Sequence, residues 1–165
     1  MIYGIEIKKL RERNGVTQKQ LAEYIGIDPK LYSHYETEDR LIPCKHLISV
    51  CDYFGVSADC LFGFVNENYS KSKKVIVDKV EVGKRLKEFR KEHKITQGKL
   101  ASILNTSQSV IAEYEKGKNL IATPFLYTIC KKYNISADYL LGRIDHPKGR
   151  MEFENLCLEE EWAIS

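Results

Sequence analysis

Apolar residues recur along the chain with the spacing of short amphipathic helices. Close to the N-terminus, Ile7 and Leu10 form one apolar stripe, which ends near Asn14–Gly15. Thr17–Gln20 has the sequence of a capping box, so it predicts the start of a second helix that Gly26 ends. Further helix starts are predicted at Asp28–Pro29, Pro43 and Ser57. Because no segment shows a clear period of two, the pattern predicts an all-α fold.

The whole pattern recurs 79 residues later. Thr17 and Gln18 align with Thr96 and Gln97 at this offset, and the register holds without a gap over roughly 60 residues, which is the length of a small domain. In the second copy, the predicted helix starts are Thr96, Ser107, Thr123–Pro124 and Ser136. A repeat of this length can enclose its own core, so it indicates a duplication rather than a solenoid. We therefore expect two tandem five-helix domains.

The repeat and the local composition divide the chain into four parts. The sequence predicts a first domain at 1–65, a linker at 66–79, a second domain at 80–145 and an acidic C-terminal tail at 146–165. The linker is polar and basic apart from Val75–Val77, a short apolar run that favours a small strand.

The composition is that of a globular protein with a packed core, with 43% hydrophobic and 30% charged residues. No apolar run approaches the roughly 20 residues that span a bilayer, and the N-terminus lacks the layout of a signal peptide. We therefore expect a cytoplasmic protein with no membrane partner. The five cysteines are odd in number and include no C-x-x-C pair, which argues against a disulfide framework and a zinc site. We expect neither a metal nor a cofactor.

The net charge of +3 is unevenly distributed. Residues 1–65 contain 8 basic and 9 acidic side chains, whereas residues 80–145 contain 12 basic and 7 acidic ones. The basic surface therefore belongs mainly to the second copy, where we expect a polyanion to dock.

Two short helices joined by a tight turn form a helix-turn-helix, whose second helix enters the major groove of DNA, but many helix pairs share that pattern. Two stretches are more specific: GKRLKEFRKEHKITQGKLASILNTSQSVIAEYEKGK, which begins at Gly83, and NISADYLLG, which begins at Asn134. They resemble the Cro/C1-type (phage-repressor-like) helix-turn-helix family, and the resemblance covers residues 4–63 and 82–142. It implies two lambda-repressor-like domains that bind double-stranded DNA.

The resemblance also implies which residues contact DNA. Gln97, and Gln18 in the first copy, match a family glutamine that bonds the DNA backbone; a role in the helix cap alone is the alternative. The exposed positions of the second copy's recognition helix are Ser107, Gln108, Ser109 and Glu113, followed on a loop by Lys116, Lys118 and Asn119. The equivalent readers of the first copy are Lys30, Ser33 and His34. The amide of Gln108 suits adenine and the carboxylate of Glu113 suits cytosine, although Glu113 could equally be a solvated helix residue.

Two pairs of opposite charges recur at the repeat offset: Arg11 with Glu36, and Arg90 with Glu115. In relatives, an arginine of the first helix holds the glutamate at the end of the recognition helix. The resemblance therefore implies a structural ion pair in each copy. Unrelated surface charges are the alternative, but chance would not readily repeat them at one offset.

The first copy departs from the family pattern in the loop after its recognition helix. Thr37-Glu38-Asp39 stands where the second copy has Lys116-Gly117-Lys118. Two carboxylates would repel phosphates, and the glycine suited to a left-handed helix exit is absent. Three roles follow for the first copy: weak DNA binding, reading of a diverged half-site, or dimerisation.

The function predicted from the sequence is that of a sequence-specific transcriptional regulator, in particular a repressor. We expect no enzyme, because the histidines are scattered and no Cys/His or Ser/His arrangement stands out. The alternative is a protein-interaction module, such as an antitoxin or antirepressor. An amphipathic tail helix would support that alternative through Phe153, Leu156, Leu158 and Trp162. A frayed terminus, or a tail folded back on its own domain, is the simpler interpretation of the same residues.

The linker length leaves two binding modes open. Its 14 residues span roughly 20 Å as a random coil and reach roughly 46 Å when extended, and successive major-groove faces lie about 34 Å apart. One chain could occupy two half-sites, and because its readers differ, it would favour an asymmetric site. A homodimer acting through the second copy would favour a palindrome.

Overall fold

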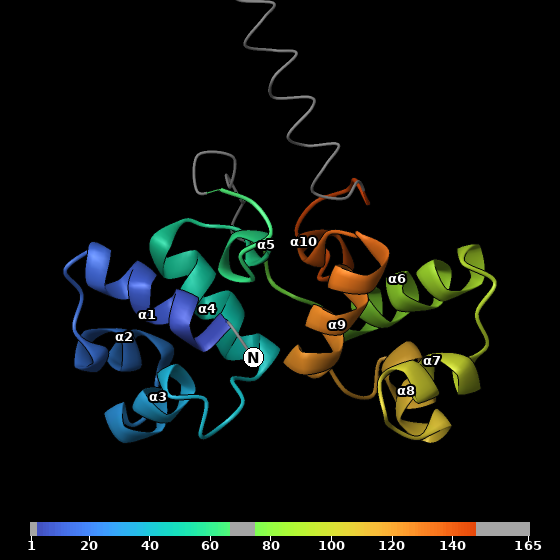
Figure 1. Cartoon of the computed structure of the whole chain (residues 1–165), viewed down its shortest axis with the longest axis horizontal. Coiled ribbons are helices and arrows are strands. Elements are labelled where there is room, and N and C mark those ends of the chain that lie inside the picture. The colour runs from blue at the N-terminus through green and yellow to red at the C-terminus, as the bar shows by residue number, and fades with distance from the viewer. Residues whose placement is uncertain (1–2, 67–74, 148–165) are drawn as a thin grey trace, which may run out of the picture. The chain divides into compact units, whose positions relative to one another are not determined.

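The computed structural model describes residues 3–66 and 75–147, and all regular structure in these ranges is helical (Figure 1). The described residues form two compact units, 3–66 and 75–147. The first contains α1 (Tyr3–Arg13), α2 (Gln18–Ile25), α3 (Pro29–Glu36), α4 (Cys44–Phe54) and α5 (Ala58–Leu61). The second contains α6 (Lys79–Glu92), α7 (Gln97–Ile103), α8 (Gln108–Glu115), α9 (Thr123–Tyr133) and α10 (Ala137–Leu140). The predicted all-α class is confirmed.

Local capping interactions set most helix ends. The hydroxyl of Thr17 accepts the Gln20 N–H at 3.1 Å, and the Gln20 side chain accepts the Thr17 N–H at 2.8 Å, so the predicted capping box is present. Asp28 caps α3 by accepting the Lys30 N–H at 2.8 Å. Gly26 ends α2 in the left-handed region, at φ +83°. These bonds satisfy backbone groups that a helix end leaves unpaired. Because the residues that make them are recognisable in the sequence, the helix ends could be predicted.

Helix α9 begins at Thr123, as predicted; this residue is buried, and Ala122 is the N-cap of the helix. Two other sequence predictions differ from the structure. The strand predicted at Val75–Val77 is not formed, since residues 75–78 have no regular structure. Lys79, assigned to the linker from its composition, belongs to α6, because Asp78 caps that helix by accepting the Val80 N–H at 2.9 Å.

The two cores are built from residues at the same repeat positions. Their shared buried pairs are Ile7 and Leu86, Leu21 and Leu100, Tyr32 and Ile111, Leu47 and Leu126, and Cys51 and Cys130. Each pair is separated by the same offset of 79 residues, so each unit encloses a core of its own. The predicted duplication therefore holds at the level of packing.

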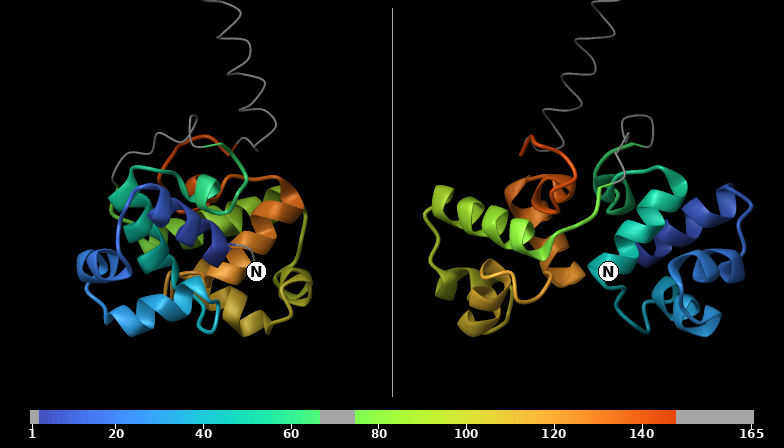
Figure 2. Two further views of the ribbon diagram at one scale, coloured as in Figure 1. Left: turned by 60° about the vertical axis from the view of Figure 1, so that its left-hand side comes forward. Right: turned by 180° about the vertical axis from the view of Figure 1, so that it is seen from behind.

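In each unit the first helix passes very close to the end of the third. A Cβ atom added to Gly83 of α6 would lie 2.2 Å from the Tyr114 carbonyl oxygen of α8. A Cβ added to Gly4 of α1 would lie 2.7 Å from the Tyr35 carbonyl oxygen of α3. Figure 2 shows α6 beside the α7–α8 pair of its unit. The absence of a side chain at these glycines thus sets how closely the third helix is held.

Candidate nucleic-acid interface

A tight turn joins α7 to α8 and α2 to α3, and both turns use the same backbone geometry. Asn105 occupies the left-handed region at φ +53°, as Gly26 does in the first unit. The Thr106 N–H then bonds the Ala101 carbonyl at 2.9 Å, and the Ile27 N–H bonds the Ala22 carbonyl at 3.0 Å. Asparagine tolerates this conformation better than other residues with side chains. The two helix pairs are therefore copies of one helix-turn-helix arrangement.

Helix α8 has one polar exposed face and one apolar face. Ile111 is fully buried, and the ring of Tyr114 meets Phe125 edge to face at 6.3 Å between centroids. The candidate readers Ser107, Gln108, Ser109 and Glu113 are all exposed. The Ser107 and Ser109 hydroxyls lie 2.9 Å apart. The apolar face fixes α8 on its unit, and the polar face is accessible to a groove.

An ion pair anchors the end of α8 to α6. Arg90 Nε donates to Glu115 Oε1 at 2.5 Å and Arg90 Nη2 donates to Glu115 Oε2 at 3.1 Å, while Nη1 donates to the Ile95 carbonyl at 2.9 Å. The Glu115 side chain is only 3% exposed. Burial alone would raise the pKa of Glu115, but the bonds from Arg90 and Gln97 outweigh it and hold that pKa below its ordinary value.

The first unit repeats this network. Arg11 Nε donates to Glu36 Oε1 at 2.5 Å, and Arg11 Nη2 donates to Glu36 Oε2 at 3.0 Å. Burial opposes ionisation here too, but bonds from Arg11 and Gln18 leave the pKa of Glu36 below its ordinary value. Two-pronged arginine contacts of this kind restrict orientation as well as adding energy. Each pair therefore restricts the orientation of the third helix of its unit, α3 or α8.

The two candidate backbone-binding glutamines are bonded to these ion pairs. Gln97 Nε2 donates to Glu115 Oε2 at 2.8 Å, and Gln18 Nε2 donates to Glu36 Oε2 at the same distance. An amide nitrogen carries two N–H donors, and this bond uses one of them. The network thus orients each glutamine at the start of the second helix, and its remaining donor suits a phosphate oxygen.

The loop after α8 carries the basic candidates. Lys116 and Lys118 are exposed on either side of Gly117, which has φ +70°. Asn119 Nδ2 donates to Glu113 Oε2 at 3.2 Å, so the structure brings these two candidates together. Glu113 is therefore an oriented acceptor, which the sequence did not indicate.

The matching loop of the first unit is acidic and follows a similar path. Glu38 adopts the left-handed region at φ +61° although it is not glycine. Its Oε1 accepts the Gly4 N–H at 3.2 Å. Asp39 Oδ2 accepts the Thr37 hydroxyl at 2.6 Å and lies 3.4 Å from His34 Nδ1. Among the first unit's candidates, His34 thus has an acidic neighbour.

The other candidates of the first unit differ in exposure. Lys30 is exposed at the start of α3, whereas Ser33 and His34 are half-buried. The structure therefore leaves this unit fewer accessible polar positions on its recognition helix than α8 has.

A half-buried histidine, His46, distinguishes the first unit from the second. The Tyr35 hydroxyl on α3 lies 3.0 Å from His46 Nδ1 on α4, and the second unit has Tyr114 and Phe125 at these positions. Burial, with a smaller contribution from Lys45, lowers the pKa of His46. A neutral imidazole can accept a hydrogen bond from the Tyr35 hydroxyl at Nδ1, and a protonated imidazole cannot.

We expect the first unit to lose stability as the pH falls below about 6.5, because the unfolded chain protonates His46 before the folded chain does. His46→Phe, which copies Phe125, should remove this part of the pH dependence. Hydrogen exchange measured between pH 5 and 8, with peptides assigned to each unit, checks this expectation. Equal pH dependence in the parent and the variant would contradict it.

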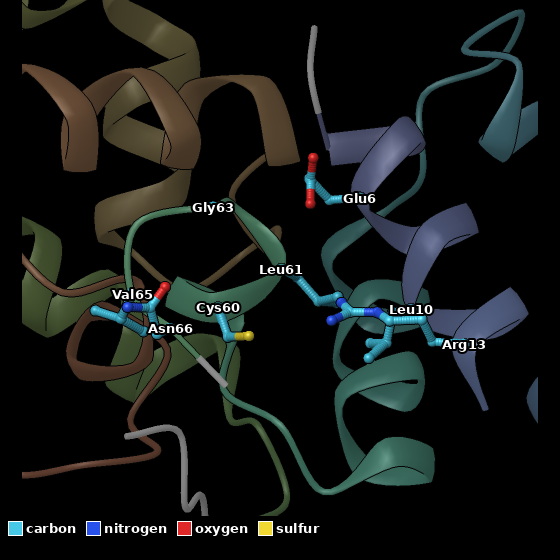
Figure 3. A pocket seen from close by; sticks show the side chains of 8 residues that line it. All are labelled: Glu6, Leu10, Arg13, Cys60, Leu61, Gly63, Val65 and Asn66. Carbon is cyan, nitrogen blue, oxygen red and sulfur yellow. The ribbon is translucent and has the colours of Figure 1, made fainter. Parts of the chain in front are cut away.

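The first unit also contains a pocket of about 510 Å³ that is separate from its helix-turn-helix pair (Figure 3). Its lining comes from α1, α5 and the segment after α5, and none of it comes from α2 or α3. Arg85 and Tyr139 of the second unit stand at the repeat positions of Glu6 and Cys60. The Arg85 guanidinium donates to the Tyr139 and Ile144 carbonyls at 2.7 Å each and lies 4.7 Å from the Tyr139 ring centroid. The lining of the pocket therefore lies outside the helix-turn-helix pair α2–α3, and the second unit has different side chains at two of its positions.

Family models match both units. A model described as a helix-turn-helix domain matches residues 83–145, and one described as helix-turn-helix matches residues 7–59. The chain belongs to the Cro/C1-type helix-turn-helix family of DNA-binding transcriptional regulators and carries two of its domains. The resemblance inferred from the sequence is therefore confirmed. Among residues 3–66 and 75–147, every helix is too short or too polar to span a bilayer.

Three curated proteins are similar to part of the chain. The HTH-type transcriptional regulator ImmR of Bacillus subtilis is 38% identical over 64 residues, 39% of this chain and 50% of the relative. The uncharacterised HTH-type regulator YobD of the same organism is 33% identical over 72 residues, 44% of this chain and 64% of the relative. The antitoxin PezA of Streptococcus pneumoniae is 34% identical over 61 residues, 37% of this chain and 39% of the relative. The chain thus spans 39 to 64% of these relatives' lengths. No solved structure matches it significantly.

Proposed function

We propose that the chain is a sequence-specific repressor that inserts α8 into the major groove of double-stranded DNA. The observation that supports this proposal is the arrangement of α8, whose exposed polar face ends in a loop with Lys116 and Lys118. Phosphate contacts set the position of a protein on the duplex, and contacts to base edges supply the specificity. The helix and its loop carry side chains suited to both tasks.

In this proposal, Gln108 and Glu113 make the contacts to base edges. The Gln108 amide can donate to and accept from adenine, and the Glu113 carboxylate can accept from the amino group of cytosine. Because Asn119 bonds Glu113, that carboxylate meets the base with part of its orientation already set. A partly fixed side chain loses less entropy on binding than a mobile one.

The second unit is the principal DNA-binding unit in this proposal. Its loop offers two lysines where the first unit offers Glu38 and Asp39, and carboxylates at that place oppose a phosphate backbone. The first unit keeps the ion pair and the bond from Gln18 to Glu36, which supports a phosphate contact by Gln18. A weaker contact to a second half-site is therefore its proposed role.

Replacing both Lys116 and Lys118 by glutamine should weaken binding to every DNA sequence by a similar factor. Each lost phosphate contact removes about 0.9 from the slope of log affinity against log salt, so the double variant should lose about 1.8. Lys131→Gln with Lys132→Gln, in the last turn of α9, makes the same charge change away from the loop and should leave the slope near that of the parent. Titration of labelled duplexes at several salt concentrations checks this, and equal slopes for the two double variants would contradict the role of the loop.

A protein-binding module is the second candidate, and one comparison favours it. A relative that is 34% identical over 61 residues is named an antitoxin. The candidate partner-binding helix of the C-terminal tail, with Phe153, Leu156, Leu158 and Trp162, lies outside the described residues. A gel shift against fragments of the source genome separates the two candidates. A protein that only binds another protein should retard no fragment specifically, and that result would contradict the repressor proposal.

A further inference from the structure

The first turn of α6 lies against the loop that follows the recognition helix. A Cβ atom added to Gly117 would lie 2.8 Å from Val80 Cα and 2.9 Å from Val80 Cγ2. Only a glycine at that position lets the loop and the helix approach so closely. The first turn of α6 and the loop after α8 are therefore in direct contact.

Lys79 makes a polar contact across this junction. Its Nζ atom donates to the Lys118 carbonyl at 3.2 Å, and the lysine is exposed. An ammonium group carries three N–H donors, so two remain after this bond. The Lys79 charge is thus placed within hydrogen-bond distance of the backbone of a loop that already carries Lys116 and Lys118.

The loop is also tied to α8 on its other side. The Lys118 N–H bonds the Glu113 carbonyl at 3.0 Å, and the Gly117 N–H bonds the Tyr114 carbonyl at 3.0 Å. The backbone that Lys79 contacts is therefore fixed relative to the recognition helix. A phosphate that meets this loop would meet the Lys79 ammonium in the same register.

We propose that Lys79 is a third phosphate-binding lysine of the second unit, which forms one DNA-backbone contact surface with Lys116 and Lys118. The inference rests on the proposed DNA binding and extends it to the junction with the linker. Ammonium groups are suited to phosphate oxygens, and three of them on one edge would hold the end of the recognition helix against the duplex.

The first unit has the opposite charge at its corresponding junction. In the first unit, the loop residue Glu38 accepts the N–H of Gly4 in the first helix. In the second unit, Lys79 of the first helix donates to the Lys118 carbonyl of the loop. The junction therefore carries an acid in one unit and a base in the other. This contrast agrees with a phosphate contact that belongs to the second unit alone.

The test uses the full chain and a duplex that the parent protein selects from a random pool, with a scrambled duplex beside it. Lys79→Gln should lower the salt slope by about 0.9 and the affinity at 0.1 M salt roughly eightfold on both duplexes. Lys84→Gln removes an exposed lysine from the middle of the same helix and should leave both quantities near the parent values. Thermal unfolding of each variant shows whether the fold is kept.

Three outcomes would count against the proposals in different ways. A folded Lys79→Gln protein with the parent slope would overturn the assignment of Lys79 and leave the proposed function intact. An equal fall with Lys84→Gln would also overturn it, because the effect would then follow net charge. A parent protein that selects no duplex would contradict the proposed function itself.

Discussion

Gly83→Ala should destabilise the second unit by about 3 kcal/mol or more and abolish specific DNA binding by the full chain. The added methyl group would lie 2.2 Å from the Tyr114 carbonyl oxygen and 3.0 Å from the Glu115 carbonyl oxygen, and a backbone carbonyl cannot turn aside as a flexible side chain can. Helix α6 must therefore move away from α8, which loosens the recognition helix. Chemical denaturation, followed by hydrogen exchange of peptides from each unit, measures the effect.

Gly98→Ala is the matched control in the same unit. A Cβ atom added at Gly98 would meet Gln108 Oε1 at an ordinary contact distance of 3.6 Å. Since Gly98 lies within α7, alanine should stabilise that helix by roughly 0.5–1 kcal/mol. A Gly83→Ala protein as stable as the Gly98→Ala protein would contradict the close approach of α6 and α8.

Arg90→Ala should destabilise the second unit by about 3 kcal/mol, because it leaves the Glu115 carboxylate buried without its main partner. Lys91→Ala removes an exposed cation one residue away and should change stability by less than about 0.5 kcal/mol. Denaturant titration of both variants checks the difference. Equal free energies of unfolding for Arg90→Ala and Lys91→Ala would show that the ion pair contributes nothing measurable to stability.

The same ion pair predicts a pH dependence. The pKa of Glu115 is held below its ordinary value of 4.5, so the contribution of the pair is fully present above that pH and is lost as the pH falls through the lowered pKa. The parent should therefore lose more stability than Arg90→Ala between pH 5 and acid pH. An equal acid loss in the two proteins would contradict the coupling.

Much of the fold could be predicted because its signals are local. The cap at Thr17, the stop at Gly26 and the proline at the start of α3 each act within one helical turn, so their effect does not depend on the tertiary structure. The duplication added a second kind of signal. Arg90 and Glu115 are far apart in the sequence, but the family resemblance implied that they pair, and their recurrence as Arg11 and Glu36 argued against chance. The side chains are in contact in both units.

Features that depend on packing could not be predicted in the same way. Gly4 and Gly83 are separated by the repeat offset of 79, but the carbonyl oxygen that each one approaches belongs to another helix. Lys79 follows a polar and basic segment, so the sequence assigned it to the linker. Its contact with the Lys118 carbonyl exists because α6 begins at Lys79. Glu38 lacks the glycine signal for a left-handed residue, and yet a bond to the Gly4 N–H accompanies that conformation.

The central claim is that side chains of α8 contact base edges and so give the protein its sequence specificity. The most direct test selects bound duplexes from a random pool, once with the parent protein and once with Gln108→Ala. The account predicts an enriched site for the parent, and the same site for the variant with preference relaxed at one or two base pairs, each by about 1–3 kcal/mol. The mass of each complex also gives the number of chains per site. An identical site for the two proteins, or no enrichment with the parent, would contradict the account.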